Sequence, residues 1–448
     1  MQATTKTYLN FVLFSDLINW SVQYMLDTKF SYADKYELVE IGEFLKRNKT
    51  AVDVEDEEEY KRVTIKINNG GVFLRDIERG INIGTKKQFR VSEGQFLLSK
   101  IDARNGAFGV VSKEVDNAIV TNDFPSFDID ITKINPQFLL LITTTKAFIK
   151  FAQSCSSGTT NRQRMDIDTF LTQKIPLPSL EEQEQIVENY NAGIRQAETL
   201  EQKANDLEKE IEEYWFEMLG IEREEKKKRK GLHFAEFKDI QQWGVDKLLS
   251  AQKGGAKSKF ETYKIGDLCK ISSGGTPSRS RKDIYYGGQV PWIKTGELNN
   301  NVLLDTEEKI TEEGLKNSSA KLYPTGSIVI AMYGATIGKS AKLGIDATTN
   351  QACAVLFDID NLLIDTNYLW EYLQSQTENL KKLAYGSAQP NLNAKTIFNF
   401  EIKVPPVSIQ EEIVNHIQNL KTEIKNLRQT AEENRKGVIK EFEQEIFN

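Results

Sequence analysis

The sequence contains one unit of about 224 residues twice, and this repeat limits the possible folds more than any other feature does. Ile41-Gly42 returns as Ile265-Gly266, and Gly106-Ala107 returns as Gly334-Ala335, with only small changes of offset. A period of this length is too long for a solenoid of stacked repeats. Further matched pairs, in chain order, are Phe14 and Phe237, Asp16 and Asp239, Trp20 and Trp243, Val22 and Val245, Gly158 and Gly386, Pro178 and Pro405, Gln183 and Gln410, Glu184 and Glu411, Ile186 and Ile413, and Val187 and Val414. The chain is therefore a duplication of one large unit.

Each copy ends in apolar residues that alternate three and four positions apart, which is typical of a coiled coil. The seam residues are Tyr190, Gly193, Ala197, Leu200, Ala204, Leu207, Ile211, Tyr214 and Met218 in the first copy, and Ile413, Ile417, Leu420, Ile424, Leu427, Ala431, Asn434 and Val438 in the second. Two matched helices, one closing each copy, favour pairing with each other over packing on their own domains. Asn434 on the seam either fixes the register or lies in an exposed stretch.

The stretch before each helix combines strand and helix patterns. Residues 61–67 and 326–330 are short, rich in β-branched residues and bounded by turn formers, as strands are. Residues 136–152 and 367–384 have helical patterns, so the domains are predicted to be α+β. The predicted organisation is a first domain at 1–180, a helix at 181–221, a linker and the start of the second repeat at 222–260, a second domain at 261–407 and a second helix at 408–448.

The net charge of −7 does not exclude nucleic-acid binding, because one helix carries most of the negative charge. Residues 181–219 hold twelve acidic and three basic residues, and the other 409 residues together have a charge of +2. That acidic helix should repel phosphate groups. The charge run at residues 222–231 is interpreted as a solvated linker rather than a DNA-binding arm.

Cysteine, histidine and hydropathy patterns predict a cytoplasmic protein without a structural zinc site. The three cysteines, Cys155, Cys269 and Cys353, are scattered and odd in number, which favours a reducing compartment. His233 and His416 have no ligand-spaced neighbour. No apolar run approaches the ~18 residues of a membrane span.

The sequence lacks a recognisable catalytic motif. Residues 334–340 (GATIGKS) resemble a phosphate-binding loop but are one residue short of it, and a loop between strands is the preferred interpretation. The acidic run at residues 53–59 is interpreted as a solvated surface rather than a metal cluster. Val404-Pro405-Pro406-Val407 lacks the flanking groups of an amino-methyltransferase motif. The chain is therefore expected to bind rather than to catalyse.

The motifs of the second copy resemble a target-recognition domain of type I restriction-modification specificity subunits. They are Gly275-Thr276-Pro277-Ser278, Tyr285 to Gly288, Val290-Pro291-Trp292-Ile293, Gly296-Glu297-Leu298, Gly334 to Lys339, Gly386 to Leu392, Val404-Pro405-Pro406 and Gln410 to Val414. The first copy is similar to another branch of the same domain type. Its segments are Lys100 to Gly109, Asp123-Phe124-Pro125 and Ile175 to Pro178, continued to Gln183. It lacks the GTPS and PWI segments, so the two domains are expected to read different sequences.

The resemblance implies two α/β target-recognition domains separated by two long antiparallel coiled-coil helices, with approximate two-fold symmetry from one polypeptide. Each domain would read one part of a split DNA target, and the helices would set the gap. Residues 186–218 as a helix span roughly 50 Å at ~1.5 Å per residue, which is at most ~15 base pairs at ~3.4 Å per pair. Reading domains about one helical turn apart are therefore reasonable.

The same resemblance implies a non-catalytic subunit that binds no cofactor of its own. Its partners would be double-stranded DNA, two methyltransferase subunits with S-adenosylmethionine, and two ATP- and magnesium-dependent motor-nuclease subunits. The acidic coiled coil is a plausible docking surface for them.

DNA contacts are expected from polar loops, because Arg, Lys, Asn and Gln reach base edges while Ser, Thr and backbone N–H groups hold phosphates. The candidates are Lys86, Lys87, Arg104, Asn105, Arg162 and Arg164 in the first domain, and Thr276, Ser278, Arg279, Arg281, Lys282, Tyr333, Lys339, Gln389 and Asn391 in the second. The residues expected to be structural are Gly106, Gly334, Gly386, Pro178 and Pro405, and Trp20, Trp243 and Trp292 are expected in cores.

Three alternatives to this function remain, of which the first two differ from it in the partner of the chain. A related system with methylation and cleavage fused in another chain predicts the same fold and DNA binding. A coiled-coil adaptor that binds protein predicts no salt-dependent DNA affinity. An enzyme with an unrecognised site would show activity as an isolated chain. The sequence does not define the target bases, the gap, the half-site of each domain or the presence of restriction subunits.

Overall fold

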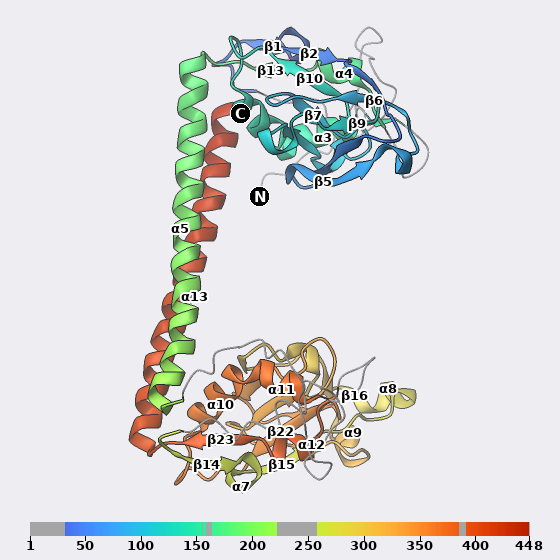
Figure 1. The fold of residues 1–448 in the computed structure, drawn as a ribbon. Coiled ribbons are helices and arrows are strands. Elements are labelled where there is room, and N and C mark those ends of the chain that lie inside the picture. The colour runs from blue at the N-terminus through green and yellow to red at the C-terminus, as the bar shows by residue number, and fades with distance from the viewer. Residues whose placement is uncertain (1–31, 155, 158–163, 222–257, 385–390, 448) are drawn as a thin grey trace, which may run out of the picture. The chain divides into compact units, whose positions relative to one another are not determined.

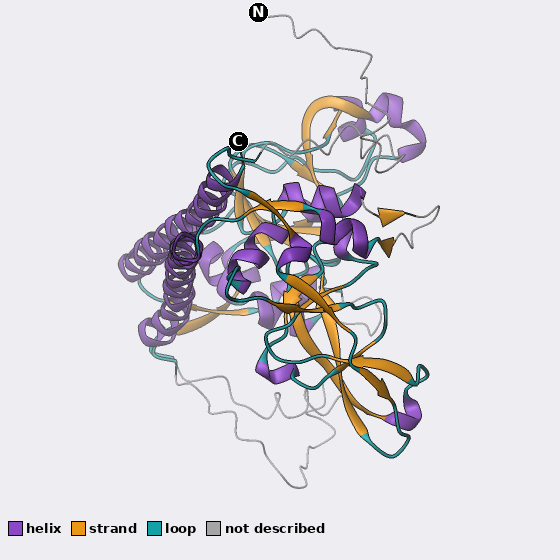
Figure 2. Ribbon diagram, turned by 90° about the horizontal axis from the view of Figure 1, so that it is seen from above, coloured by secondary structure: helices purple, strands orange, loops and turns teal. Residues whose placement is uncertain are grey.

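The computed structural model of the chain describes residues 32–154, 156–157, 164–221, 258–384 and 391–447. The chain forms two compact units (Figure 1): unit 1 comprises Met1–Leu200 and Gln429–Asn448, and unit 2 comprises Glu201–Arg428. Each unit contains both helices and strands, as the α+β prediction requires. Figure 2 colours the helices and strands of the chain separately.

The main sheet of unit 1 has the strand order β2-β10-β7-β8. Its strands are β2 (Leu45–Asn48), β7 (Phe96–Leu98), β8 (Phe108–Val110) and β10 (Ser126–Ile129), and the helices of this domain are α2 (Pro136–Thr143), α3 (Lys146–Ser154) and α4 (Ile167–Thr172). The fully buried rings of Phe96, Phe127 and Phe170 lie with centroids 6.0 to 6.4 Å apart. Burial of one such ring contributes about 1.5–3 kcal/mol, so this aromatic layer joins the sheet firmly to α4.

A second sheet of unit 1 has the order β3-β6-β9-β4-β5. Its strands are β3 (Ala51–Asp53), β4 (Glu59–Lys66), β5 (Gly71–Arg79), β6 (Lys87–Arg90) and β9 (Ile119–Val120). The strand predicted at residues 61–67 corresponds to β4. Asn68 and Asn69 take φ values of 56° and 61° and begin the turn into β5, which ends the strand one residue early.

The main sheet of unit 2 has the order β15-β22-β19-β20-β17. Its strands are β15 (Lys270–Ser273), β17 (Asn301–Leu303), β19 (Ile328–Ala331), β20 (Ser340–Leu343) and β22 (Cys353–Phe357). A smaller sheet in the order β18-β16-β21 adjoins two short helices. These elements are α8 (Lys282–Tyr285), β16 (Tyr286–Ile293), β18 (Lys309–Ile310), α9 (Glu312–Lys316) and β21 (Thr348–Thr349). The remaining helices of the domain are α7 (Ile265–Leu268), α10 (Thr366–Ser375), α11 (Thr377–Leu383) and α12 (Ala394–Phe398).

The two units share one topology, which is the structural counterpart of the sequence repeat. The order β2-β10-β7-β8 of unit 1 corresponds to β15-β22-β19-β20 of unit 2. In unit 1, β1 (Leu38–Glu40) pairs antiparallel with β13 (Lys174–Pro176), and in unit 2 β14 (Glu261–Lys264) pairs in the same way with β23 (Glu401–Val404). The differences include the β3-β6-β9-β4-β5 sheet of unit 1, the β18-β16-β21 sheet of unit 2 and the additional strand β17 in the main sheet of unit 2. The repeat therefore keeps a four-stranded frame and varies what is attached to it.

Two 40-residue helices, α5 (Leu180–Leu219) and α13 (Val407–Ile446), contribute to both units. In unit 1 the Tyr190 and Phe442 rings are 6.2 Å apart, and a Cβ built on Gly193 would lie 2.1 Å from Cγ1 of Val438. Residue numbers rise along α5 as they fall along α13, so the two segments are antiparallel. Glycine at 193 permits this close approach.

The pairing in unit 2 has the same direction. The Tyr214 and His416 rings are 4.1 Å apart, and the guanidinium of Arg428 donates to both carboxylate oxygens of Glu208 at 2.9 Å. The predicted pairing of the two seam helices is therefore confirmed within each unit. Seam residues Ala197, Ala204, Ile413, Ile417 and Ala431 are buried.

A buried glutamine fixes the start of each long helix to its domain. Gln183 is fully buried; its Oε1 accepts from the N–H of Asn135, and its Nε2 donates to the carbonyls of Lys133 and Pro178. Each bond is 2.7 to 3.1 Å long. Since a buried amide without partners costs free energy, complete satisfaction of Gln183 makes this junction specific.

Gln410 makes the corresponding bonds in unit 2. It is fully buried, accepts from the N–H of Asp365 at 2.8 Å, and donates to the carbonyls of Leu363 and Pro405 at 2.9 and 2.7 Å. The repeated proline and glutamine of the sequence therefore have one role in both copies.

The helix predicted at residues 136–152 is interrupted in the structure, because α2 ends and α3 begins within a run of threonines. The hydroxyls of Thr143, Thr144 and Thr145 each donate to the carbonyl three residues earlier, and the N–H of Phe148 donates to the Thr145 hydroxyl. Such local bonds compete with the helical ladder. The predicted helix at residues 367–384 is likewise divided, into α10 and α11.

Candidate nucleic-acid interface

Three segments of unit 1 meet just after strand β7. The backbone N–H of Lys100 donates to the carbonyl of Asp123 at 2.8 Å, and the N–H of Met165, in β12 (Arg164–Met165), donates to the carbonyl of Lys100 at 2.8 Å. We call this meeting point the unit 1 crossing. Its two shared bonds run between backbone groups, so they do not require particular side chains.

The unit 1 crossing gathers positive charge around one carboxylate. Nε and Nη2 of Arg164 donate to the two carboxylate oxygens of Asp123 at 3.0 and 3.1 Å, and this pairing raises the pKa of Arg164. The pKa of Lys100 is lowered, first by partial burial and then by the charges of Arg47 and Arg164. Arg164 was predicted as a DNA contact, and the structure places it beside a second cation.

Arg47 in β2 is the third cation of the crossing. Its guanidinium carbon lies 5.5 Å from the Phe127 ring centroid, and its Nη2 donates to Oδ1 of Asn122 at 3.4 Å. Its Nε is buried without a hydrogen-bond partner, and burial lowers its pKa. Burial of a charged donor in this way is costly and is unexpected for a residue that only supports the fold.

Arg104 and Asn105 lie on the loop that leaves the crossing, in the short helix η4 (Ala103–Asn105). The carbonyl of Asn105 accepts from the N–H of Asn68 at 2.7 Å, and the carbonyl of Arg104 accepts from Nε2 of Gln153 at 3.0 Å. Gly106 then takes φ of 78°, which favours glycine, so its predicted structural role is confirmed.

Lys86 and Lys87 lie on the β3-β6 side of the second sheet. Nζ of Lys86 donates to Asp56 at 2.5 Å and to the carbonyl of Gly80 at 2.7 Å, while Lys87 is opposite Asp53 in the β3–β6 pair. The acidic run at residues 53–59 therefore offsets the charge of this predicted cluster. A DNA contact by Lys86 would require release from Asp56. Both lysines stay predictions.

A polar cleft of about 420 Å³ lies among β4, β5, β6 and β9. Arg62, Arg75, Thr85, Gln88 and Thr121 are among its lining residues. Thr121 begins the loop that carries the Asp123 end of the crossing. Neither arginine could be selected from the sequence, because an arginine in a strand pattern is typical of an ordinary exposed position.

Unit 2 has the same backbone crossing with different side chains. The N–H of Met332 donates to the carbonyl of Ala352 at 2.8 Å, and the N–H of Leu392 donates to the carbonyl of Met332 at 2.7 Å. Asn391 precedes Leu392 and forms a β-bridge with Tyr333, and both side chains are exposed. Two predicted contacts far apart in sequence are therefore adjacent.

Lys339 ends the loop of residues 332–339, which joins β19 to β20 as expected for the GATIGKS segment. Gly334 and Gly338 take φ of 88° and 77°, and the N–H of Gly338 donates to the carbonyl of Ala331 at 2.9 Å. Nζ of Lys339 donates to Asn299 at 3.2 Å. The end of the loop is thus bonded back to the last residue of β19.

Arg279 is enclosed by aromatic and acidic partners. Its guanidinium carbon lies 4.2 Å from the Tyr286 ring centroid and 5.2 Å from that of Trp292, and it forms a bidentate pair with Glu308. Trp292 is 2% exposed, and its indole N–H donates to the carbonyl of Gly275 at 2.9 Å, so its predicted core role is confirmed. These contacts already stabilise the loop, and any DNA contact of Arg279 stays a prediction.

Thr276 and Ser278 lie on the same loop as Arg279. The hydroxyl of Thr276 donates to Oε1 of Gln351, the neighbour of Ala352 in the unit 2 crossing. The hydroxyls of Ser278 and Ser280 are 2.8 Å apart. The loop therefore reaches the crossing through Thr276.

Arg281 and Lys282 extend from the end of this loop into α8. Nη1 of Arg281 donates to the Tyr285 hydroxyl at 3.0 Å, and Lys282 is exposed. Arg162 and Gln389, also predicted contacts, lie outside the described residues. So do Gly386, Trp20 and Trp243.

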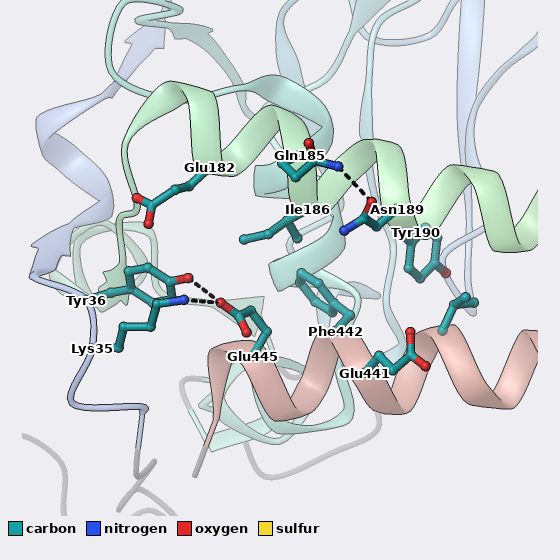
Figure 3. A pocket seen from close by; sticks show the side chains of 11 residues that line it. Lys35, Tyr36, Glu182, Gln185, Ile186, Asn189, Tyr190, Glu441, Phe442 and Glu445 are labelled. Carbon is teal, nitrogen blue, oxygen red and sulfur yellow. Dashed lines mark hydrogen bonds and ion pairs between the residues drawn. The ribbon is translucent and has the colours of Figure 1, made fainter.

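A separate cavity of about 340 Å³ in unit 1 lies between the start of α5 and the end of α13 (Figure 3). Nζ of Lys35 donates to Oε1 of Glu445 at 2.6 Å, and the Tyr36 hydroxyl donates to the same oxygen. These bonds lower the pKa of Glu445. Ile186 and Phe442 contribute apolar lining. Lys35 and Glu445 of this lining are engaged in joining the segment before β1 to α13.

Neither of the two described cysteines is activated as a nucleophile. Burial raises the pKa of the Cys269 and Cys353 thiols to about 12, so both stay protonated and weakly nucleophilic. In the described part of the chain, no group of three or more His, Cys, Asp or Glu side chains is placed to hold a metal ion. None of the described helices has the length and apolar character to cross a bilayer.

Arg47 and Lys100 are two further candidates that were not selected from the sequence. Lys100 begins the KIDARNGAFG motif, and Arg47 lies in a strand without a motif. The register of the β2–β10 strand pair places Arg47 opposite Phe127, and this pairing cannot be predicted from the sequence alone. The Lys100 position could have been selected from its place in the motif.

Comparison with known proteins identifies the family. A family model for the type I restriction modification DNA specificity domain matches residues 33–209 and again residues 257–433. The chain belongs to this family. The two matches follow the two copies of the repeat, so the predicted family and the repeated α+β domains are confirmed.

Individual relatives of this specificity-domain family are distant. The HindI specificity subunit of Haemophilus influenzae is 26% identical over 400 residues, which cover 76% of this chain and 84% of that protein. The EcoR124I/EcoR124II specificity subunit of Escherichia coli is 29% identical over 182 residues, which cover 40% of this chain and 44% of that protein. The match thus spans less than half of the E. coli relative.

A solved structure supports the fold. The chain aligns with a TM-score of 0.62 and 17% identity to a structure from work on complex assembly and conformational transition of the type I R-M system. The alignment covers 93% of this chain and 97% of that one.

Proposed function

We propose that this specificity-domain protein reads a bipartite DNA sequence, one part with each unit, within a type I restriction-modification complex. One observation carries the proposal: the same backbone crossing occurs in both units but presents different side chains. In unit 1 it presents Arg164 and Lys100, and in unit 2 it presents Asn391 and Tyr333. A constant frame with different polar groups is what reading two different half-sites requires.

In this proposal the chain has no catalytic role and holds no cofactor. Two methyltransferase subunits would supply S-adenosylmethionine chemistry, and two restriction subunits would supply ATP- and magnesium-dependent cleavage. Residues 181–219 of the acidic helix carry −9 and would contact these protein partners rather than phosphate. The cytoplasm is the expected compartment.

The test is genome-wide mapping of methylated adenines in cells that express the chain with its native methyltransferase partner. Exchange of residues 36–175 for those of a relative should change one part of a split motif, and exchange of 261–402 should change the other. Cells with the methyltransferase alone serve as the control. An unmethylated genome with both chains expressed would refute DNA reading and favour the adaptor alternative. Cleavage or methylation of DNA by the isolated chain would refute the non-catalytic assignment.

A further inference from the structure

The strand registers and backbone bonds place each residue of the unit 1 crossing at a defined position of unit 2. Lys100 corresponds to Met332 and Asp123 to Ala352, because the same N–H to carbonyl bond joins each pair. Arg164 corresponds to Asn391, since each precedes the residue that donates to the crossing carbonyl.

Arg47 corresponds to Ile271 by strand register. Arg47 is opposite Phe127 in the β2–β10 pair, and Phe127 is opposite Phe96 in the β10–β7 pair. In unit 2, Ile271 is opposite Leu356, which is opposite Ile328. All three cations and the carboxylate of unit 1 are therefore neutral residues in unit 2. The fold tolerates neutral side chains at these places, so the charges of unit 1 serve another purpose.

The pairing of Arg164 with Asp123 leaves one edge of the guanidinium available. A guanidinium has two edges that each present two N–H donors side by side. Asp123 occupies the edge of Nε and Nη2, and the edge of Nη1 and Nη2 has no other hydrogen-bond partner among the described residues. The Arg164 side chain is 58% exposed. Asp123 thus holds a rigid fork of two donors at an accessible surface.

A fork of two parallel donors matches O6 and N7 of guanine in the major groove, which is the commonest specific arginine contact with DNA. A carboxamide, as at Asn391, matches N6 and N7 of adenine. A phosphate contact would not need an arginine fixed by a carboxylate, because phosphate accepts from many directions and a nearby negative charge weakens its binding.

We propose that Arg164 reads a guanine in the half-site bound by unit 1, with Asp123 as the positioning residue and with Lys100 and Arg47 attracting the DNA. This inference rests on the proposed function. Lys100 and Arg47 offset the negative charge of Asp123, so the crossing remains attractive to DNA while Asp123 orients the fork.

The test uses the complete complex and the methylation map of the cell. Arg164→Asn places in unit 1 the residue that unit 2 has at this position, so the backbone frame should persist. We expect about tenfold to hundredfold loss of preference for guanine at one position of one half-site, with the other half-site unchanged. Lys113→Gln, which removes an exposed cation of the same unit, is the matched control and should leave the motif unchanged.

The variant Asp123→Asn distinguishes a role of Asp123 in positioning Arg164 from a role in folding. It should keep methylation but relax the same guanine position, whereas a purely structural loss would lower methylation without changing the base preference. The proposal is overturned if Arg164→Asn leaves the guanine requirement intact. It is also overturned if Arg164→Asn abolishes methylation and Asp123→Asn leaves the guanine requirement intact. A wild-type motif without guanine in the unit 1 half-site would also overturn it. Failure of the wild-type complex to methylate a split motif would instead refute the proposed function.

Discussion

Replacement of Gln410 by methionine tests whether the buried glutamine fixes α13 to its domain. Methionine has nearly the same volume, so packing is kept while three hydrogen bonds, to Asp365, Leu363 and Pro405, are lost. At about 1 kcal/mol for each bond, the junction should lose about 3 kcal/mol. That corresponds to a roughly hundredfold rise in the population of the locally opened state.

Hydrogen exchange followed by mass spectrometry provides the assay. Peptides that cover the end of β23 and the first turns of α13 should exchange faster, while those from unit 1 should not change. Gln418→Ala on the exposed side of the same helix is the control. Gln183→Met should give an equal effect at the start of α5, because its three bonds are the same in kind. Unchanged protection at the β23–α13 junction in Gln410→Met would refute the reasoning.

Three further predictions concern stability. Gly193→Ala should destabilise unit 1 by about 1–3 kcal/mol because the added methyl meets the opposite helix, whereas Gly437→Ala, which meets nothing, should stabilise it by about 0.5–1 kcal/mol in urea unfolding. Lys421→Met should cost about 3–5 kcal/mol because it leaves the buried carboxylate of Glu371 unpaired, and adding Glu371→Leu should recover most of the loss in a double-mutant cycle. The pKa of Glu445 is lowered in the folded chain, so its ion pair stabilises the fold fully above the unfolded glutamate pKa of about 4.3. This stabilisation is lost as the pH falls through the lowered pKa. The melting temperatures of wild type and Glu445→Gln should therefore converge in acid.

The sequence was sufficient for the repeat, the domain type and the paired helices. These features rest on periodic apolar residues and on motifs that recur at one offset. It was insufficient for the element ends, because these depend on side-chain bonds such as those of Thr144 and Thr145, which divide a continuous helical pattern.

The candidate interface was only partly predictable. Arg164, Tyr333 and Asn391 were selected as polar loop residues, and the structure brings the last two together. Arg47 escaped selection because its neighbours come from strand register. Lys86 looked like an available cation, yet its partner Asp56 lies 30 residues earlier in the chain. Charge in a sequence does not show which cations the fold has already paired.

The backbone bonds that both crossings share have a consequence for how such proteins diversify. Since these bonds run between main-chain groups, the residues displayed there are free from the demand to maintain the fold. Substitution at positions such as Lys100 or Arg164 should alter recognition at little thermodynamic cost, as the neutral set in unit 2 illustrates. Under the proposed function, new specificities would therefore arise by point mutation within one copy while the other copy kept its own half-site.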